Sequence, residues 1–223
     1  MNIDIKLENV SKSYNGVTIL NNINLEIKKG ETIGVIGSNG SGKSVLFKVI
    51  CGFISPDNGA TYIRGLKLGD NIDFPEDVGV FINEPGYISI FNGFKNLKFL
   101  ADINNKIDDK KIKMTMEKVG LNPNNKAKVQ DYSLGMKQKL GIAQAIMEDQ
   151  DIIVLDEPFN ALDYKTYDDI KNIIKSLKDE GRTILLTSHN FEDIEQLCDS
   201  IYIIEEGELK PATPEIINRY RCR

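Results

Sequence analysis

The sequence contains no tryptophan, only one histidine and only three cysteines in 223 residues. Because Cys51, Cys198 and Cys222 are odd in number and far apart, we expect neither a disulfide framework nor a zinc site, which fits a reducing cytoplasm. No stretch approaches the roughly 20 apolar residues that cross a bilayer, and the N-terminus has no apolar signal region. We therefore expect any role at a membrane to depend on partner chains.

An excess of positive charge is also missing. Lys and Arg number 28 against 33 Asp and Glu, which gives a net charge of −5. Because proteins that bind nucleic acids favour a basic face, we expect no nucleic acid among the partners. The hydrophobic content of 41% and the charged content of 27% are ordinary for a globular protein. The length allows one domain with an inserted lobe.

The most informative stretch covers residues 37–44, Gly-Ser-Asn-Gly-Ser-Gly-Lys-Ser. Its spacing is that of a phosphate-binding loop: Gly, four free positions, Gly-Lys, then Ser or Thr. Glycines let such a loop fold back and point its N–H groups at an anion. Lys43 would supply a charge for the outer phosphates, and the Ser44 hydroxyl would face Mg²⁺.

The neighbours of this loop support that interpretation over a flexible turn with a surface lysine. Residues 32–36 predict a buried strand, and apolar residues at helical spacing follow over 45–50. A helix N-terminus behind a glycine loop is a ready anion site. The candidate nucleotide-binding residues here are Gly37, Ser38, Asn39, Gly40, Ser41, Gly42, Lys43, Ser44 and Val45.

The rest of the chain predicts an α/β protein. Alternating apolar residues over 3–8 and 23–27 predict an antiparallel β-region beside the nucleotide site. Apolar runs at 32–36, 152–155 and 183–187 predict buried parallel strands. Helical patterns between the strands then imply a right-handed, mostly parallel sheet of the phosphate-loop type.

Between residues 85 and 147 the pattern becomes mostly helical, with predicted helices over 96–103 and 109–119. We interpret this stretch as a helical subdomain inserted into the sheet. The prediction is one domain over 1–223, with about 1–84 and 148–223 as the α/β core and about 85–147 as the helical subdomain.

Three polar residues follow predicted strands. Asp156 ends an apolar run and could hold Mg²⁺, and Glu157 beside it could orient or deprotonate a water aimed at the γ-phosphate. The alternative is an acidic strand end in solvent. His189, the single histidine, follows the strand over 183–187 and could contact a terminal phosphate oxygen. Its alternative is an ordinary surface histidine.

Four further residues have two possible roles each. Ser133 caps a predicted helix, and Gly135 would let a phosphate approach its first-turn N–H groups; the alternative is an ordinary capped helix. Asp163 could cap the helix that begins near Tyr164, or carry information between two nucleotide sites. Tyr14 could stack on an adenine, or pack on its own hairpin.

The order of these motifs resembles the ATP-binding subunit of ABC transporters over almost the whole chain. The resemblance identifies residues 37–44 as Walker A and 152–156 as Walker B, with Glu157 as the catalytic glutamate. It aligns 132–136, Tyr-Ser-Leu-Gly-Met, with the signature Leu-Ser-Gly-Gly-Gln. It makes 161–163 the D-loop, His189 the switch histidine and Tyr14 the adenine-stacking aromatic residue. The implied cofactors are ATP and Mg²⁺, and the implied catalytic residues are Glu157, His189 and Lys43.

Two stretches depart from the family pattern. The Q-loop glutamine, which contacts Mg²⁺ in the family, falls at Asn83, followed by Glu84. Asn is one methylene shorter, so the contact would be made by Asn83, by Glu84, or through water. Leu134 and Met136 replace a glycine and a glutamine of the signature. The stretch over residues 133–138, with Glu-Pro after Asn83, resembles the branch of the family that exports bacitracin and lantibiotic-type peptides or confers immunity to them.

The resemblance also implies partners. Two subunits, which we expect to be identical, would pack head to tail, each ATP lying between one chain's Walker A and the other's signature. Integral membrane permease chains would dock on residues 83–94, at the cytoplasmic face of the membrane. The apolar residues there could instead be lobe core; they are Tyr87, Ile88, Phe91 and Phe94.

Two other functions fit part of the pattern. One is a soluble ABC-type ATPase acting on DNA or the ribosome. The acidic charge and the lack of a coiled-coil insertion or a second ATPase half disfavour it. The other is a weakly hydrolysing regulatory subunit, motivated by Asn83 and the altered signature and disfavoured by the presence of Glu157 and His189.

Overall fold

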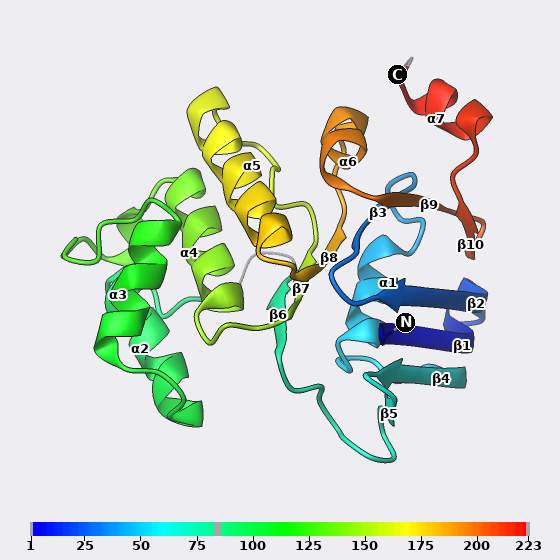
Figure 1. Ribbon diagram of the computed structural model, residues 1–223, viewed down its shortest axis with the longest axis horizontal. Helices are drawn as coiled ribbons and strands as arrows, with labels where there is room; N and C mark the ends of the chain where they lie inside the picture. The colour runs from blue at the N-terminus through cyan, green and yellow to red at the C-terminus, as the bar shows by residue number, and fades with distance from the viewer. Residues whose placement is uncertain (1, 83–85, 222–223) are drawn as a thin grey trace.

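The computed structural model describes residues 2–82 and 86–221. Asn83 and Glu84, on which one metal prediction depends, lie outside these ranges. Within them, no helix combines the length and the apolar character needed to cross a membrane. The elements, labelled in Figure 1, are β1 (Ile3–Tyr14), β2 (Val17–Lys28), β3 (Thr32–Ile36), α1 (Lys43–Ile50), β4 (Asn58–Ile63), β5 (Leu66–Lys67), β6 (Val78–Phe81), α2 (Gly93–Asn104), α3 (Asp109–Lys118), the 3₁₀ turn η1 (Val129–Asp131), α4 (Leu134–Ile146), β7 (Ile152–Leu155), α5 (Tyr164–Asp179), β8 (Thr183–Leu186), α6 (Phe191–Leu197), β9 (Ser200–Glu205), β10 (Glu208–Pro211) and α7 (Pro214–Arg221).

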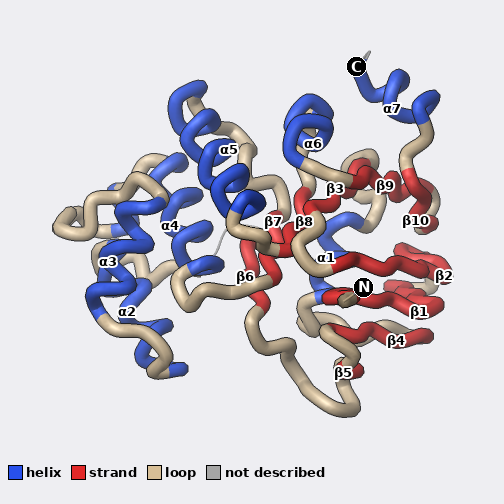
Figure 2. Tube along the Cα trace, viewed as in Figure 1, coloured by secondary structure: helices blue, strands red, loops and turns tan. Residues whose placement is uncertain are grey.

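The strands form two sheets, drawn in red in Figure 2. The first is antiparallel, with the order β2-β1-β4-β5. The second has the order β10-β9-β3-β8-β7-β6 and is parallel except for β10, which runs antiparallel to β9. The predicted α/β class, with an antiparallel region and a mostly parallel sheet, is confirmed.

Strand β7 shows why the central strands are continuously apolar. All four of its residues are buried. Ile152 and Val154 join the core between the two sheets, where α1 packs, whereas Ile153 and Leu155 join the core under α4, α5 and α6. Because successive side chains of a strand point to opposite faces, a strand covered on both faces needs apolar residues at every position.

The helices α2, α3 and α4 form a lobe at one end of the molecule (Figure 1). Helix α2 begins at Gly93 rather than at residue 96, because the side chain of Asn92 accepts a hydrogen bond from the Lys95 N–H at 2.9 Å and caps the helix. Helix α4 packs directly on β6: a Cβ atom at Gly79 would lie only 1.7 Å from the Ala145 carbonyl oxygen. The lobe therefore meets the sheet backbone to backbone at this point.

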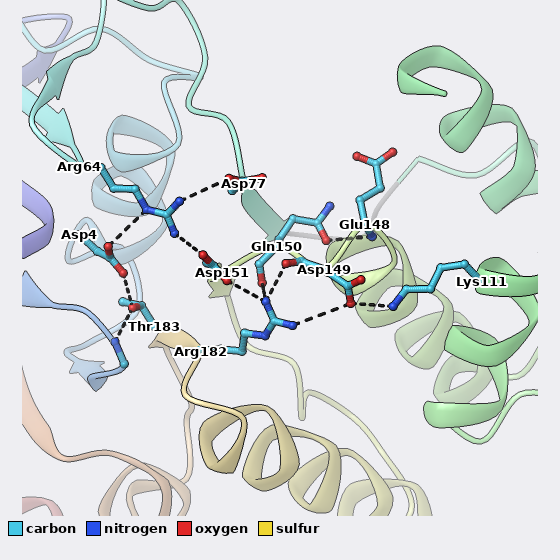
Figure 3. Close-up of polar contacts among 11 residues, drawn as sticks. Asp4, Arg64, Asp77, Lys111, Glu148, Asp149, Gln150, Asp151, Arg182 and Thr183 are labelled. Atoms are coloured by element: carbon cyan, nitrogen blue, oxygen red, sulfur yellow. Dashed lines mark hydrogen bonds and ion pairs between the residues drawn. The ribbon is translucent and has the colours of Figure 1, made fainter. Parts of the chain in front are cut away.

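A chain of charges joins the antiparallel sheet to the parallel sheet (Figure 3). The buried carboxylate of Asp4 accepts hydrogen bonds from the Thr183 hydroxyl at 2.6 Å and from Arg64 Nε at 3.3 Å. Arg64 also binds Asp77 and, at 2.8 Å, Asp151. Asp151 and Thr183 lie where β7 and β8 begin, at the sheet edge opposite to the one that carries Asp156 and His189. This network therefore stabilises the packing of the two sheets away from the candidate site.

From Asp151 the charges continue to the helical lobe (Figure 3). Arg182 binds the Asp151 carboxylate at 2.9 Å and the Asp149 carbonyl oxygen at 2.7 Å. The Asp149 carboxylate then pairs with Lys111 of α3 at 2.6 Å. Most of these side chains are partly exposed, so the outer pairs contribute little individually.

Candidate active site

The phosphate loop connects the end of β3 to the start of α1, as the sequence predicts. Gly42 has φ 107°, a left-handed conformation that glycine adopts without strain. Gly37 is required for a different reason: a Cβ atom there would lie 2.6 Å from both the Ile204 carbonyl oxygen and the Ser41 Oγ. The loop is therefore held close to β9, and a bend at Ser38 is closed by the Ser41 N–H at 3.1 Å.

Lys43 is the first residue of α1 and is only 7% exposed. Its ammonium donates hydrogen bonds to the carbonyl oxygens of Gly37 at 2.8 Å and Ser38 at 3.1 Å. The side chain thus lies over the loop. The first N–H groups of a helix have no partner within the helix and carry partial positive charge. Together with Lys43, they make this end of α1 attractive to phosphate.

Two acidic residues follow β7, and the histidine follows the neighbouring β8. The Thr187 hydroxyl joins them: it donates to Asp156 Oδ1 and accepts from the Glu157 N–H, both at 2.8 Å. Thr187 is fully buried. Sequence reasoning missed this residue, although a hydroxyl at the end of an apolar strand, next to Ser188 and His189, was the available signal.

Glu157 has a buried carboxyl oxygen without a hydrogen-bond partner in the part of the chain that the structure describes. Its backbone has a positive φ of 54°, and its side chain is 19% exposed. Oε1 is buried and makes no hydrogen bond among the described residues. It lies 3.6 Å from His189 Nε2, which is too long for a good hydrogen bond.

Burial raises the pKa of the Glu157 carboxyl above its ordinary value. The charge of Asp156 adds to this effect, whereas His189 and Lys43 oppose it. A carboxylate with a raised pKa is a stronger base when ionised, and it titrates closer to neutral pH. The burial, the unpaired acceptor atom and the raised pKa of Glu157 are features that would suit a general base.

These residues line one cleft of about 400 Å³. Its walls are Tyr14, Ile19, Asn39, Gly40, Gly42, Lys43, Ser44, Val45, Asp156, Glu157 and His189. Tyr14 ends β1 and is 43% exposed, with the Lys12 ammonium 5.5 Å from its ring centroid. A larger cavity of about 560 Å³ lies between α3, α4 and α5, but it includes none of the predicted phosphate or acidic residues. The smaller cleft is the candidate active site.

Ser44 and Asp156 both line the cleft. Across the described ranges, no three His, Cys, Asp or Glu side chains form a cluster that would hold a metal alone. Mg²⁺ commonly takes one or two carboxylates and completes its coordination with phosphate oxygens and water. A hydroxyl and a buried carboxylate beside a phosphate loop fit that preference.

Ser133, Gly135 and Asp163 do not line the cleft. Ser133 is exposed and caps α4 by accepting a hydrogen bond from the Met136 N–H at 3.2 Å. Gly135 is buried, and a Cβ atom there would lie 2.6 Å from Cγ2 of Thr166. Within one chain, the missing side chain is therefore explained by packing against α5, a contact that the sequence did not suggest.

The apolar residues after position 85 divide into two groups. Tyr87 and Phe94 pack against the main core, and the Tyr87 hydroxyl donates to the Lys137 carbonyl oxygen at 2.7 Å. Phe91 lies against Phe99. Ile88 is 47% exposed. The segment is thus partly lobe core and partly surface.

Comparisons with known proteins agree with this geometry. The family described as ABC transporter matches residues 20–160. The uncharacterised ABC transporter ATP-binding protein YybJ of Bacillus subtilis is 40% identical over 96% of this chain and 99% of its own. The bacitracin transport ATP-binding protein BcrA of Enterococcus faecalis is 37% identical over 92% of this chain and 67% of its own. The lantibiotic transport ATP-binding protein SrtF of Streptococcus pyogenes is 36% identical over 92% and 88%.

The fold also matches a solved structure. A dimeric ATP-binding cassette in a post-hydrolysis state, bound to ADP and Pi, superposes with a TM-score of 0.82 and 26% identity. The match covers 92% of this chain and 96% of that one. The arrangement of the two sheets and the helical lobe is therefore that of a cassette known as a dimer.

Proposed function

The chain belongs to the ABC transporter family as an ATP-binding, ATP-hydrolysing subunit, and from this premise we propose that it powers the export of a peptide antibiotic or a similar hydrophobic compound. The observation that carries the proposal is the identity of 36–37%, over 92% of the chain, to proteins named for lantibiotic and bacitracin transport. In this proposal the transported compound passes through separate permease chains.

We assign ATP to the cleft between Tyr14 and His189. The exposed Tyr14 ring stacks on the adenine, and the loop N–H groups bind the phosphates. The Lys43 ammonium exchanges its contacts with Gly37 and Ser38 for phosphate oxygens. Ser44 and Asp156 would hold Mg²⁺, and Asn83 or Glu84 would supply a further ligand. When bound, Mg²⁺ neutralises phosphate charge.

The hydrolytic step is assigned to Glu157 and His189. Glu157 accepts a proton from the attacking water, a role that suits its raised pKa and unpaired Oε1. His189, next to it, contacts a terminal phosphate oxygen. Thr187 holds Asp156 and the Glu157 backbone in register through its two hydrogen bonds.

The site is completed by a second copy of the chain. Cassettes of this family form dimers, and we propose a head-to-tail homodimer. The N-terminus of α4 from the second chain, with Ser133 and Gly135, then closes over the phosphates, and Asp163 lies at the contact. Permease chains dock at residues 83–94, where Ile88 and Ile90 are exposed. The complex works at the cytoplasmic face of the cell membrane.

The test is a transport experiment. The chain is co-purified with its permease, and ATP-dependent movement of labelled bacitracin or a lantibiotic is measured in inverted vesicles. We expect transport with the natural chain and none with Glu157→Gln. ATP hydrolysis without movement of either peptide would contradict the proposed substrate class while leaving the ATPase assignment intact.

A further inference from the structure

A buried carboxylate outside the cleft has no role in the mechanism described so far. Asp193 lies in the first turn of α6 and has an exposed fraction of 0%. Aspartate is rarely buried unless its charge is paired and hydrogen-bonded. Its partners therefore indicate what the carboxylate stabilises.

The Asp193 partners come from two other elements. Oδ1 accepts a hydrogen bond from the Tyr167 hydroxyl of α5, and the Lys171 ammonium lies 3.5 Å from the same oxygen. Oδ2 accepts a hydrogen bond from the Ser188 hydroxyl at 3.0 Å. Asp193 thus joins α5 to the turn that leaves β8.

This network holds the chain on both sides of His189. The Ser188 Oγ, besides donating to Asp193, accepts the Asn190 N–H at 3.1 Å. The Asn190 side-chain amide donates to the Tyr167 hydroxyl at 3.2 Å. Asp193 therefore holds Ser188, before His189, and Tyr167 holds Asn190, after it. In the described network His189 itself makes no hydrogen bond to either side chain.

The chemistry of the pair favours a permanent contact. Burial, together with the hydrogen bond to Asp193, raises the pKa of the Tyr167 phenol to about 12. The phenol therefore remains a hydrogen-bond donor at physiological pH. Its ring packs on Phe159 with centroids 5.2 Å apart, and the Lys171 ammonium lies 5.7 Å from the ring centroid. These contacts restrict the position of the hydroxyl.

We propose that Asp193 and Tyr167 are positioning residues that hold the His189 turn at the distance from Glu157 that hydrolysis requires. The inference rests on the proposed role of His189. Small displacements of groups around the reacting atoms are costly: a misplacement of about 1 Å can reduce a rate about 100-fold. Because α5 begins directly after Asp163, the same contact ties the switch histidine to the helix that follows the D-loop.

The test measures ATP hydrolysis by the full chain carrying Asp193→Asn, and separately Tyr167→Phe, which removes a single hydroxyl and leaves the ring packing. We expect kcat to fall about 10- to 100-fold, whereas nucleotide affinity stays unchanged because the phosphate loop is not touched. Asp168→Asn is the matched control, because Asp168 is exposed on α5; its kcat should equal that of the natural chain.

A double-mutant cycle with His189→Ala separates positioning from general support of the fold. If Asp193 acts through His189, Asp193→Asn should lower kcat little further in the His189→Ala background. The inference would be overturned if Asp193→Asn lowered kcat by the same factor in the His189→Ala background as in the natural chain. A normal kcat for both Asp193→Asn and Tyr167→Phe would also overturn it. If His189→Ala alone hydrolyses ATP normally, the proposed role of His189 fails, and this inference fails with it. If the Asp193→Asn variant does not fold, the same double-mutant cycle is measured with Tyr167→Phe and His189→Ala.

Discussion

Gly135 of α4 packs directly against Thr166 of α5: a Cβ atom at position 135 would lie 2.6 Å from Cγ2 and 2.8 Å from Oγ1 of Thr166. Thr166 in turn holds Asp163 twice, by its hydroxyl at 2.7 Å and its N–H at 3.0 Å. The starts of α4 and α5, which are assigned to the signature and the D-loop, are therefore packed together within one chain.

This contact predicts the effect of Gly135→Ala. The added methyl would push α4 away from α5, so we expect ATP hydrolysis to fall by about an order of magnitude or more. Adding Thr166→Ala removes the two closest atoms and should restore part of the rate. Thr166→Ala alone should keep most activity, because the backbone N–H of residue 166 can still donate to the Asp163 carboxylate that caps α5. If steady-state phosphate release shows no rescue, the glycine is needed for phosphate approach from the second chain instead.

Glu157→Gln should bind ATP with unchanged affinity but hydrolyse it about 100- to 10,000-fold more slowly, the range attributed to general base catalysis. The amide cannot accept the proton of the attacking water. Size-exclusion chromatography with ATP should then show a persistent dimer. Glu76→Gln, an exposed residue outside the cleft, is the control. Near-normal turnover of the Glu157 variant would remove this residue from its assigned role.

The same substitution should change stability with pH. The pKa of Glu157 is raised above 4.5 in the folded chain, so the unfolded chain loses this proton first, and the free energy of unfolding falls as pH rises through that window. Glutamine avoids this loss. We expect a higher Tm for nucleotide-free Glu157→Gln at pH 8, by a few degrees if the effect is about 1 kcal/mol. The difference in Tm between the variant and the natural chain should shrink towards pH 5. A Tm difference that does not change with pH would contradict the raised pKa of Glu157.

Lys43→Ala should weaken ATP binding roughly 10- to 100-fold, since a hydrogen bond to a charged group contributes about 1.5–3 kcal/mol. Titration calorimetry of the natural and variant chains measures the loss. Lys48→Ala, in the last turn of the same helix, is the matched control and should bind normally. Unchanged affinity of Lys43→Ala would place the triphosphate elsewhere.

Arg64→Ala should lower the free energy of unfolding by about 2–3 kcal/mol, because it leaves the buried Asp4 carboxylate without its cation. Urea unfolding measures the change. Lys67→Ala, which breaks the exposed pair with Asp70, should cost no more than about 1 kcal/mol. Equal effects of the two substitutions would show that the Asp4–Arg64 contact contributes no more than a surface pair.

Periodicity was enough to predict most of the fold. Strands β3, β7 and β8 are buried at every position and mostly apolar because both faces of the sheet are covered. The glycine spacing of residues 37–44 left little choice of structure for the loop. The acidic residues after β7 and the histidine after β8 were each expected near the terminal phosphate, and the two parallel strands do bring them to one edge of the sheet.

The remaining features depend on contacts between distant residues. Asp193 and Tyr167 are 26 positions apart, and neither pattern nor spacing distinguishes a buried aspartate on a short helix from an exposed one. Gly135 matched an expected motif, so its packing on Thr166 went unpredicted. Helix α2 begins at Gly93, three residues before the predicted start, because the side chain of Asn92 caps it.

Where α4 rests on β6, Gly79 and Ala145 bring two backbones together with no layer of side chains between them. Such a layer would absorb a small displacement by changing rotamers. Without it, we expect a tilt of α4 to be passed to β6 rather than absorbed at this contact. Since β6 ends at Phe81, any rearrangement that tilts α4 would also move that end of the strand.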